Sequence, residues 1–160
     1  MKIKEFIRGT APLLSVLALA LGHGNEIFPS ANAKVGTSGW FVTEQNEVRL
    51  LSATKGIGGR KSVKLGLQFR LRKGWKIYWR SPGDAGFPPR IYWGKSQNLE
   101  NIKFHWPVPT RFKVLGLNTV GYENEVVFPI TAYVKDPDQP LKLNAELQYL
   151  TCNDICSVNH

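Results

Sequence analysis

The only two cysteines of this 160-residue chain, Cys152 and Cys156, are separated by three residues near its C-terminal end. In an extended strand their Cα atoms would lie about 13 Å apart, at roughly 3.3 Å per residue, whereas a disulfide needs them within about 7 Å. Asn153 and Asp154 favour a turn between them, which would bring the sulfurs together. The spacing is therefore compatible with a disulfide that closes a very small ring.

Such a small ring would stabilise a fold only weakly. In the chain-entropy description a five-residue loop contributes about 2 kcal/mol, against about 5 kcal/mol for a loop of 100 residues. Exposed or strained bridges of this kind tend to exchange with other thiols. We therefore interpret Cys152 and Cys156 as a candidate redox pair, with a structural loop disulfide in a non-catalytic binding domain as the first alternative.

A copper-handling or zinc site is a second alternative for the same segment. Cys152, Cys156 and the terminal His160 are soft and borderline ligands of the kind that bind copper(I) or zinc. The spacing is loose and the sequence offers no clear fourth ligand. The metal site therefore remains a weaker hypothesis than the redox pair.

No other motif indicates a cofactor or a further catalytic group. The segment GKS at 94–96 has Pro89 where a phosphate-binding loop needs glycine, and KGIGGRKS at 55–62 does not match the dinucleotide fingerprint. His105 lies beside Trp106 in an apolar segment, which is typical of a packed histidine. The chemistry of this chain is thus expected at its two cysteines, without a cofactor.

The chain after residue 34 shows the two-residue periodicity of β-strands and no helical periodicity. Alternating residues and turn signals predict strands at 63–71, 75–79, 90–93, 101–106, 126–134 and 141–150. The Pro- and Gly-containing segments 80–90 and 107–125 are expected to be loops. Pro129 predicts that its strand is unpaired along at least one edge. These elements predict an all-β fold, an antiparallel β-sandwich.

The N-terminal residues have the pattern of a secretory signal peptide. A basic start is followed by an apolar stretch at 11–21, which is too short to span a bilayer, and by small residues at Ala31 and Ala33. We expect a signal peptide at 1–33, cleaved near Ala33, and one exported domain at 34–160 without stable membrane insertion. The chain carries a net charge of +9, which in an exported domain indicates anionic surfaces or acidic partners and not nucleic acid.

Four segments in order resemble the N-terminal periplasmic domain of the DsbD-type thiol:disulfide interchange proteins, in the branch related to suppressor-of-copper-sensitivity reductases. They are GWKIYWRSPGDAGFPPRIYW at 74–93, WPVPTRF at 106–112, GYENEVVFPI at 121–130 and LQYLTCNDIC at 147–156. The resemblance spans roughly 40–156 and implies an immunoglobulin-like sandwich. It also implies a periplasmic location and roles related to cytochrome c biogenesis and copper tolerance.

The resemblance assigns roles to particular residues. Cys152 and Cys156 would cycle between dithiol and disulfide, and Cys156 would form the mixed disulfide with partners. A cap loop at 109–116, with Phe112 as its shielding ring, would cover the cysteines. The partners implied are periplasmic thioredoxin-like proteins, with reducing equivalents supplied by a separate membrane electron donor. Arg111 or Lys113 would favour a thiolate if the fold brings either of them close.

Members of this family continue beyond the cysteines with a closing strand. On that basis we expect the 34–160 domain to be C-terminally incomplete and its sandwich to be missing the closing strand. The strand that ends at Leu150 would then have no return partner, which leaves a sheet edge unpaired.

Overall fold

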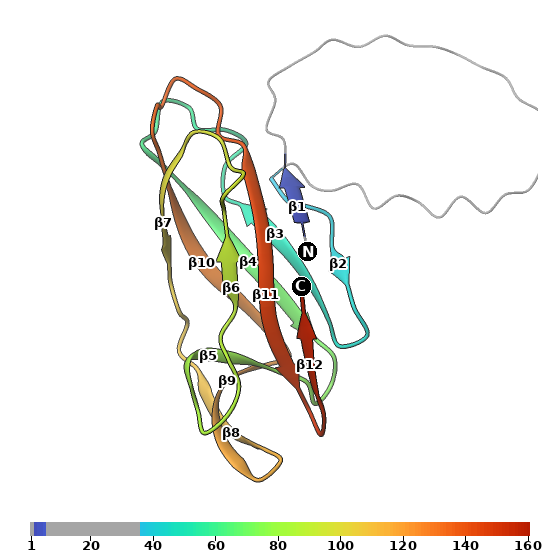
Figure 1. The fold of residues 1–160 in the computed structure, drawn as a ribbon. Coiled ribbons are helices and arrows are strands. Elements are labelled where there is room, and N and C mark those ends of the chain that lie inside the picture. Colours follow the sequence, from blue (N-terminus) through green and yellow to red (C-terminus); the bar gives the residue numbers. More distant parts are fainter. Residues whose placement is uncertain (1, 6–35) are drawn as a thin grey trace, which may run out of the picture.

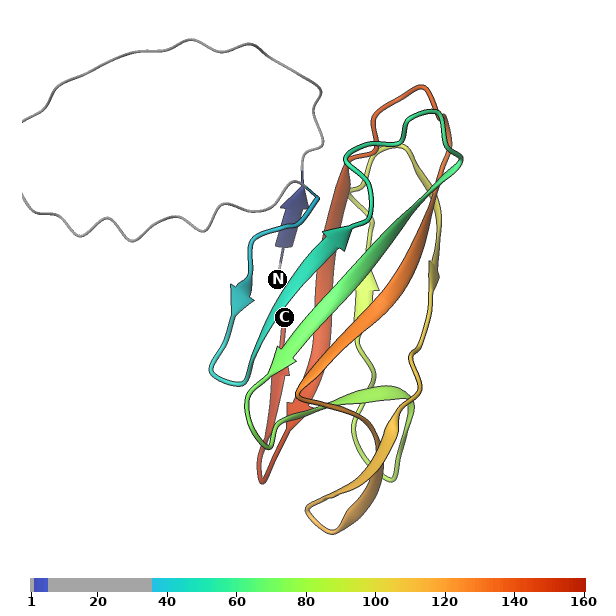
Figure 2. The same cartoon turned by 180° about the vertical axis from the view of Figure 1, so that it is seen from behind.

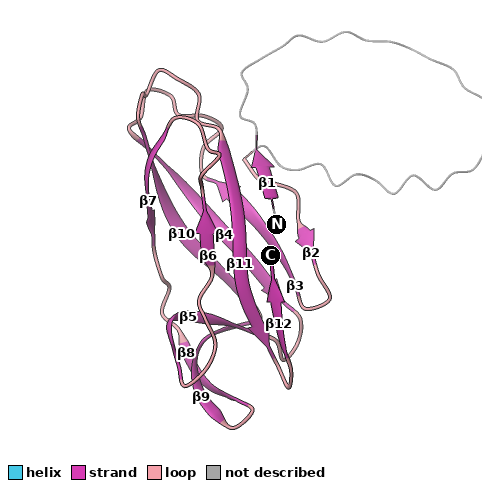
Figure 3. Ribbon diagram, in the orientation of Figure 1, coloured by secondary structure: helices cyan, strands magenta, loops and turns pink. Residues whose placement is uncertain are grey.

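A computed structural model describes residues 2–5 and 36–160, which form strands and contain no helix. The strands make two antiparallel sheets that pack into a sandwich (Figures 1 and 2). Figure 3 shows the same arrangement with strands and loops in separate colours. The predicted all-β, immunoglobulin-like antiparallel sandwich is confirmed.

The first sheet has five strands, with the longest pair at its centre. Its order is β2 (Phe41–Val42), β3 (Asn46–Ser52), β4 (Ser62–Leu71), β10 (Glu125–Val134) and β7 (Leu99–Phe104).

The second sheet has seven strands and is built around β11 (Leu143–Cys152), which is paired along both edges. Its main order is β1 (Lys2–Glu5), β11, β5 (Lys76–Gly83), β9 (Leu117–Glu123) and β8 (Thr110–Val114). The remaining strands, β6 (Arg90–Tyr92) and β12 (Cys156–Asn159), also pair with β11. Strand β12 lies on the edge of β11 that faces away from β5 and β6 (Figure 1).

The core lies between the sheets and is built by strict alternation along the long strands. On β11 every second residue from Leu143 to Tyr149 is buried in this core. The rings of Phe69 and Tyr149 pack edge to face with centroids 5.0 Å apart, so that they join the two sheets. The Tyr149 hydroxyl donates a hydrogen bond of 2.8 Å to Oδ1 of Asn46 on β3. This contact fixes β11 against the opposite sheet, three residues before the first cysteine.

Pro129 lies where the pairing between β10 and β7 stops. Strand β7 pairs with Ile130 to Val134, whereas the first half of β10 pairs with β4 alone. The Pro129 carbonyl points to the β7 side and accepts a hydrogen bond from the His105 amide. Because the Pro129 nitrogen faces the same side, its missing N–H falls at the end of the β7–β10 pairing and not within it. The sequence prediction of an unpaired edge is confirmed for this half of the strand.

The expectation that no strand returns after Leu150 is wrong. Strand β12 runs back antiparallel to β11 and pairs Tyr149 with Asn159 and Leu150 with Val158. The side-chain amide of Asn159 donates to Oγ1 of Thr151, which holds the end of β12 in place. A three-residue turn after Cys152 is enough to form this hairpin, so β11 is not an unpaired edge.

The prediction of a loop at 107–125 is also wrong in large part, because this segment contains the β8–β9 hairpin. The two strands pair from Thr110–Gly121 to Val114–Leu117. Leu115 and Gly116 form the two-residue turn, and both have positive φ, at 52° and 82°. A leucine at the first of these positions is unusual, because type I′ turns favour asparagine there, and the prolines upstream obscured the hairpin pattern.

The predicted signal peptide at 1–33 lies outside the described residues, except for the strand β1. Within residues 2–5 and 36–160, no helix is long and apolar enough to cross a membrane.

Alkaline pH tests the burial of Tyr149. Burial raises the pKa of Tyr149 to about 12, against the hydrogen bond to Asn46, which lowers it. Between about pH 10 and 12 the unfolded chain therefore loses a proton that the folded chain keeps, so the free energy of unfolding falls as pH rises. We expect Tyr149→Phe to flatten this fall in urea unfolding curves, and the exposed Tyr92→Phe to keep the native slope. Equal slopes in the two variants would contradict the assignment.

Candidate redox site

Cys152 and Cys156 form a disulfide at the end of the β11–β12 hairpin, with an S–S distance of 2.11 Å and Cα atoms 4.1 Å apart. Two hydrogen bonds of 2.9 Å between Asn153 and Ile155 hold the turn between them. The backbone N–H of Asn153 donates to the Ile155 carbonyl, and the backbone N–H of Ile155 donates to Oδ1 of Asn153. The sequence prediction that this turn brings the sulfurs together is confirmed.

The two cysteines differ in burial. Cys152 is fully buried, with a relative exposure of 0%, whereas Cys156 is exposed. The alternation along β11 places Cys152 on the outer face of its sheet, since Tyr149 and Thr151 face the core. Cys152 is therefore buried by something that covers this outer face.

The cover is a second apolar cluster, separate from the main core. It contains buried Tyr78 and Val114 beside Cys152, with Phe112 and Leu150 partly buried against them. Val114 and Phe112 belong to β8, so the β8–β9 hairpin packs over the outer face of β5 and β11. The hairpin thus encloses the Cys152 side of the disulfide and leaves Cys156 at the margin.

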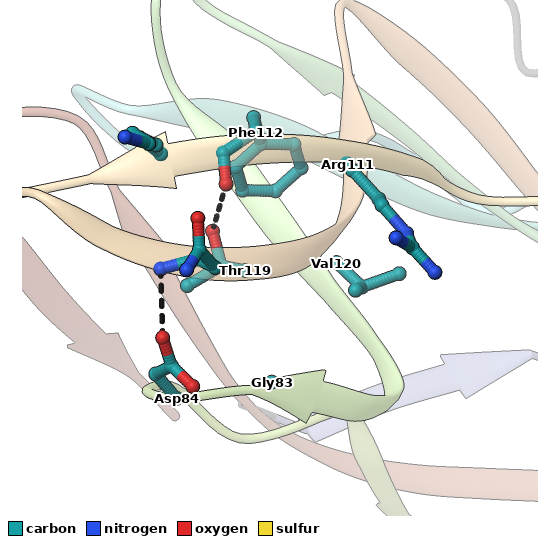
Figure 4. A pocket seen from close by; sticks show the side chains of 8 residues that line it. Gly83, Asp84, Arg111, Phe112, Thr119 and Val120 are labelled. Atoms are coloured by element: carbon teal, nitrogen blue, oxygen red, sulfur yellow. Dashed lines mark hydrogen bonds between the residues drawn. The ribbon is translucent and has the colours of Figure 1, made fainter.

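Phe112 is fixed within this cover from several directions. The centroid of its ring lies 6.5 Å from the centroid of the Tyr78 ring and 5.5 Å from Nζ of Lys76. Its carbonyl accepts a hydrogen bond of 3.1 Å from Oγ1 of Thr119, shown in Figure 4. The structure therefore brings the sequence-predicted Phe112 together with Cys152, on a strand and not on a loop.

Lys76 is a charged residue of the site that the sequence analysis missed. It lies directly opposite Cys152 in the β5–β11 register, so the two side chains share one face, with Cβ atoms expected about 5 Å apart. Its Nζ contacts Glu123 at 3.3 Å and donates to the Gly74 carbonyl at 3.0 Å. Only the register of two strands far apart in sequence shows this neighbourhood, so no local signal pointed to it.

Arg111 and Lys113 flank Phe112 but point to the opposite face of β8, because side chains alternate along a strand. They line an open pocket of about 600 Å³ beneath the hairpin, with Asp84 and Asn118 (Figure 4). The backbone N–H of Asn118 donates a hydrogen bond of 3.0 Å to Oδ2 of Asp84, and this bond connects the hairpin to the loop after β5. The suggested role of these two cations beside the thiols does not fit this placement, because Lys76 occupies the cysteine face.

Tyr78 is a buried member of the apolar cluster that covers Cys152. Burial raises its pKa above the ordinary value of 10.0, because the apolar cluster disfavours the charged phenolate. Gly86 packs directly on the face of its ring, where any Cβ would collide with the aromatic carbons. The loop after β5 therefore also packs against Tyr78.

The metal alternative is not supported by the described residues. Within 2–5 and 36–160, no three His, Cys, Asp or Glu side chains are grouped as they are in a metal site. Cys152 and Cys156 are joined to each other, and His160 lies beyond the far end of β12.

Comparisons with known proteins relate this sandwich to a family of thiol:disulfide interchange proteins. Residues 47–159 match the family model described as thiol:disulfide interchange protein DsbD, N-terminal. Among solved structures, the N-terminal periplasmic domain of ScsB from Proteus mirabilis matches with a TM-score of 0.65 and 36% sequence identity. That match covers 78% of this chain and 48% of the ScsB chain, so this chain spans about half its length. Curated protein sequences give no match.

Fold and site together define a β-sandwich domain of the thiol–disulfide exchange class. The chain belongs to the DsbD N-terminal family.

Proposed function

We propose that this chain is a periplasmic module that exchanges disulfides with thioredoxin-like proteins through Cys152 and Cys156. The observation that carries the proposal is the burial difference at the bridge, with Cys156 exposed and Cys152 enclosed by the hairpin. Exchange requires that a foreign thiolate reach one sulfur of the disulfide. The family and the periplasmic relative support the assignment.

In the reductive direction a partner thiolate attacks Sγ of Cys156. This attack forms a partner–Cys156 disulfide and releases Cys152 as a thiolate, which takes up a proton. The second thiolate of the partner then attacks the sulfur of the partner's first cysteine in the mixed disulfide. This step releases Cys156 as a thiolate, which also takes up a proton. The partner leaves as a disulfide, and the domain has gained two electrons as a dithiol, which it passes to an oxidised protein by the reverse steps.

Phe112 controls access in this scheme. Lys76 shares the face of Cys152, but its ammonium contacts Glu123 on β9, on the other side of β5 from Cys152, so its charge is not directed at the leaving thiolate. Phe112 covers the Cys152 side, so that thiols approach from the Cys156 side alone. We propose that the reducing equivalents come from a separate membrane electron donor.

Single-cysteine variants test which sulfur is attacked. Cys152→Ala retains the exposed sulfur and Cys156→Ala retains the enclosed one. We expect Cys152→Ala to form a mixed disulfide with a thioredoxin that keeps only its exposed cysteine, activated as a thionitrobenzoate disulfide, at least about tenfold faster than Cys156→Ala, because access limits the reaction and thionitrobenzoate leaves. Non-reducing gels of alkylated samples measure both rates. Equal capture by both variants, or capture by neither, would contradict the scheme and favour a structural disulfide.

Truncation of the covering ring tests the shielding by Phe112. Phe112→Ala removes the side chain packed beside Tyr78 and Cys152, so we expect dithiothreitol to reduce the disulfide about threefold to tenfold faster. Alkylation of timed samples measures the rate. Arg111→Ala is the matched control, because Arg111 is adjacent on β8 but points to the other face. A rate that is unchanged, or raised equally by both substitutions, would show that Phe112 does not shield the bridge.

A further inference from the structure

Four exposed apolar side chains lie on the two hairpins that carry and cover the disulfide, and we call them the apolar rim. They are Leu115, Leu117, Ile155 and Val158. Their relative exposures are 66%, 44%, 66% and 52%, respectively. None of them is needed for the cover over Cys152, which uses Phe112, Val114, Tyr78 and Leu150.

Sequence position and strand register place the rim beside the residues that form and cover the disulfide. Ile155 precedes Cys156 in the turn, and Val158 shares its face of β12 because the two are two residues apart. On the hairpin, Leu117 is paired with Val114, which is buried beside Cys152, and Leu115 follows Val114 at the turn. Both hairpin turns lie at the same end of the sandwich (Figures 1 and 2).

Leu115 is exposed at a backbone position that suits another residue better. Its φ of 52° lies in the left-handed region, which bulky side chains rarely adopt and asparagine adopts readily. With Gly116 next to it, asparagine would complete the most favoured two-residue hairpin turn. A leucine here strains the turn and exposes apolar surface to water, so the turn itself gives no reason for it.

We propose that the apolar rim is the docking surface for the thioredoxin-like partner that attacks Cys156, with Leu115 as its main contact. This inference rests on the proposed function, because any protein whose cysteine reaches Sγ of Cys156 must lie against these side chains. The partner that fits presents its reactive cysteine within an apolar surface.

The substitution Leu115→Asn separates docking from folding. It removes the apolar contact while improving the turn, so we expect a melting temperature equal to or above that of the native chain. We expect the rate of exchange with reduced thioredoxin, divided by the rate of reduction by dithiothreitol, to fall about tenfold. The division removes any change in the reactivity of the disulfide itself.

Two further variants complete the experiment. Leu117→Thr introduces a β-branched residue, which suits a strand, and removes a second rim contact, so we expect its rate ratio to fall as well. Tyr133 is an exposed residue next to the C-terminal end of β10, and that end of the strand lies away from both hairpin turns (Figure 1). Tyr133→Asn should therefore keep the native ratio.

The possible outcomes distinguish the two proposals. Native ratios in both Leu115→Asn and Leu117→Thr, with rapid exchange between thioredoxin and the native chain, would overturn the docking surface and leave the exchange function intact. If thioredoxin reacts with the native chain no faster than dithiothreitol does, the exchange function fails and the docking surface fails with it.

Discussion

The packing of the β8–β9 hairpin against the outer face of β5 and β11 is the interaction on which the site depends. Phe112 and Val114 bury Cys152 together with Tyr78, while Cys156 stays exposed. A disulfide in an unprotected hairpin turn would expose both sulfurs and react with any thiol. The hairpin makes the bridge asymmetric, so that under the proposed function one sulfur would receive the attack and the other would become the leaving group.

The rest of the sandwich keeps that geometry fixed. Strand β11 carries Cys152, and it is paired on both edges at that point, with β5 on one side and β12 on the other. Tyr149 anchors β11 to the opposite sheet through its ring contact with Phe69 and its hydrogen bond to Asn46. The strand that presents the disulfide is therefore one of the most constrained in the fold, and the turn beyond it is the exposed part.

The sequence predicted the elements whose signals are local. Alternation along 141–150 gave the core face of β11, and Asn153 with Asp154 indicated the turn that closes the disulfide. It failed where the outcome depends on pairing between distant segments. Prolines before Thr110 concealed the β8–β9 hairpin, the short strand β12 had too few residues to show a period, and the position of Lys76 opposite Cys152 follows only from strand register.

The central claim is that the Cys152–Cys156 bridge opens and closes in exchange with other thiols and does not brace the fold. Equilibrium titration of the chain in glutathione or dithiothreitol buffers, with the dithiol fraction read by alkylation, tests it most directly. We expect the reduction potential of the Cys152–Cys156 pair to lie between about −120 and −270 mV, the range of known exchange proteins. A reduction potential below about −300 mV, as found for structural disulfides, would contradict an exchange role for this bridge.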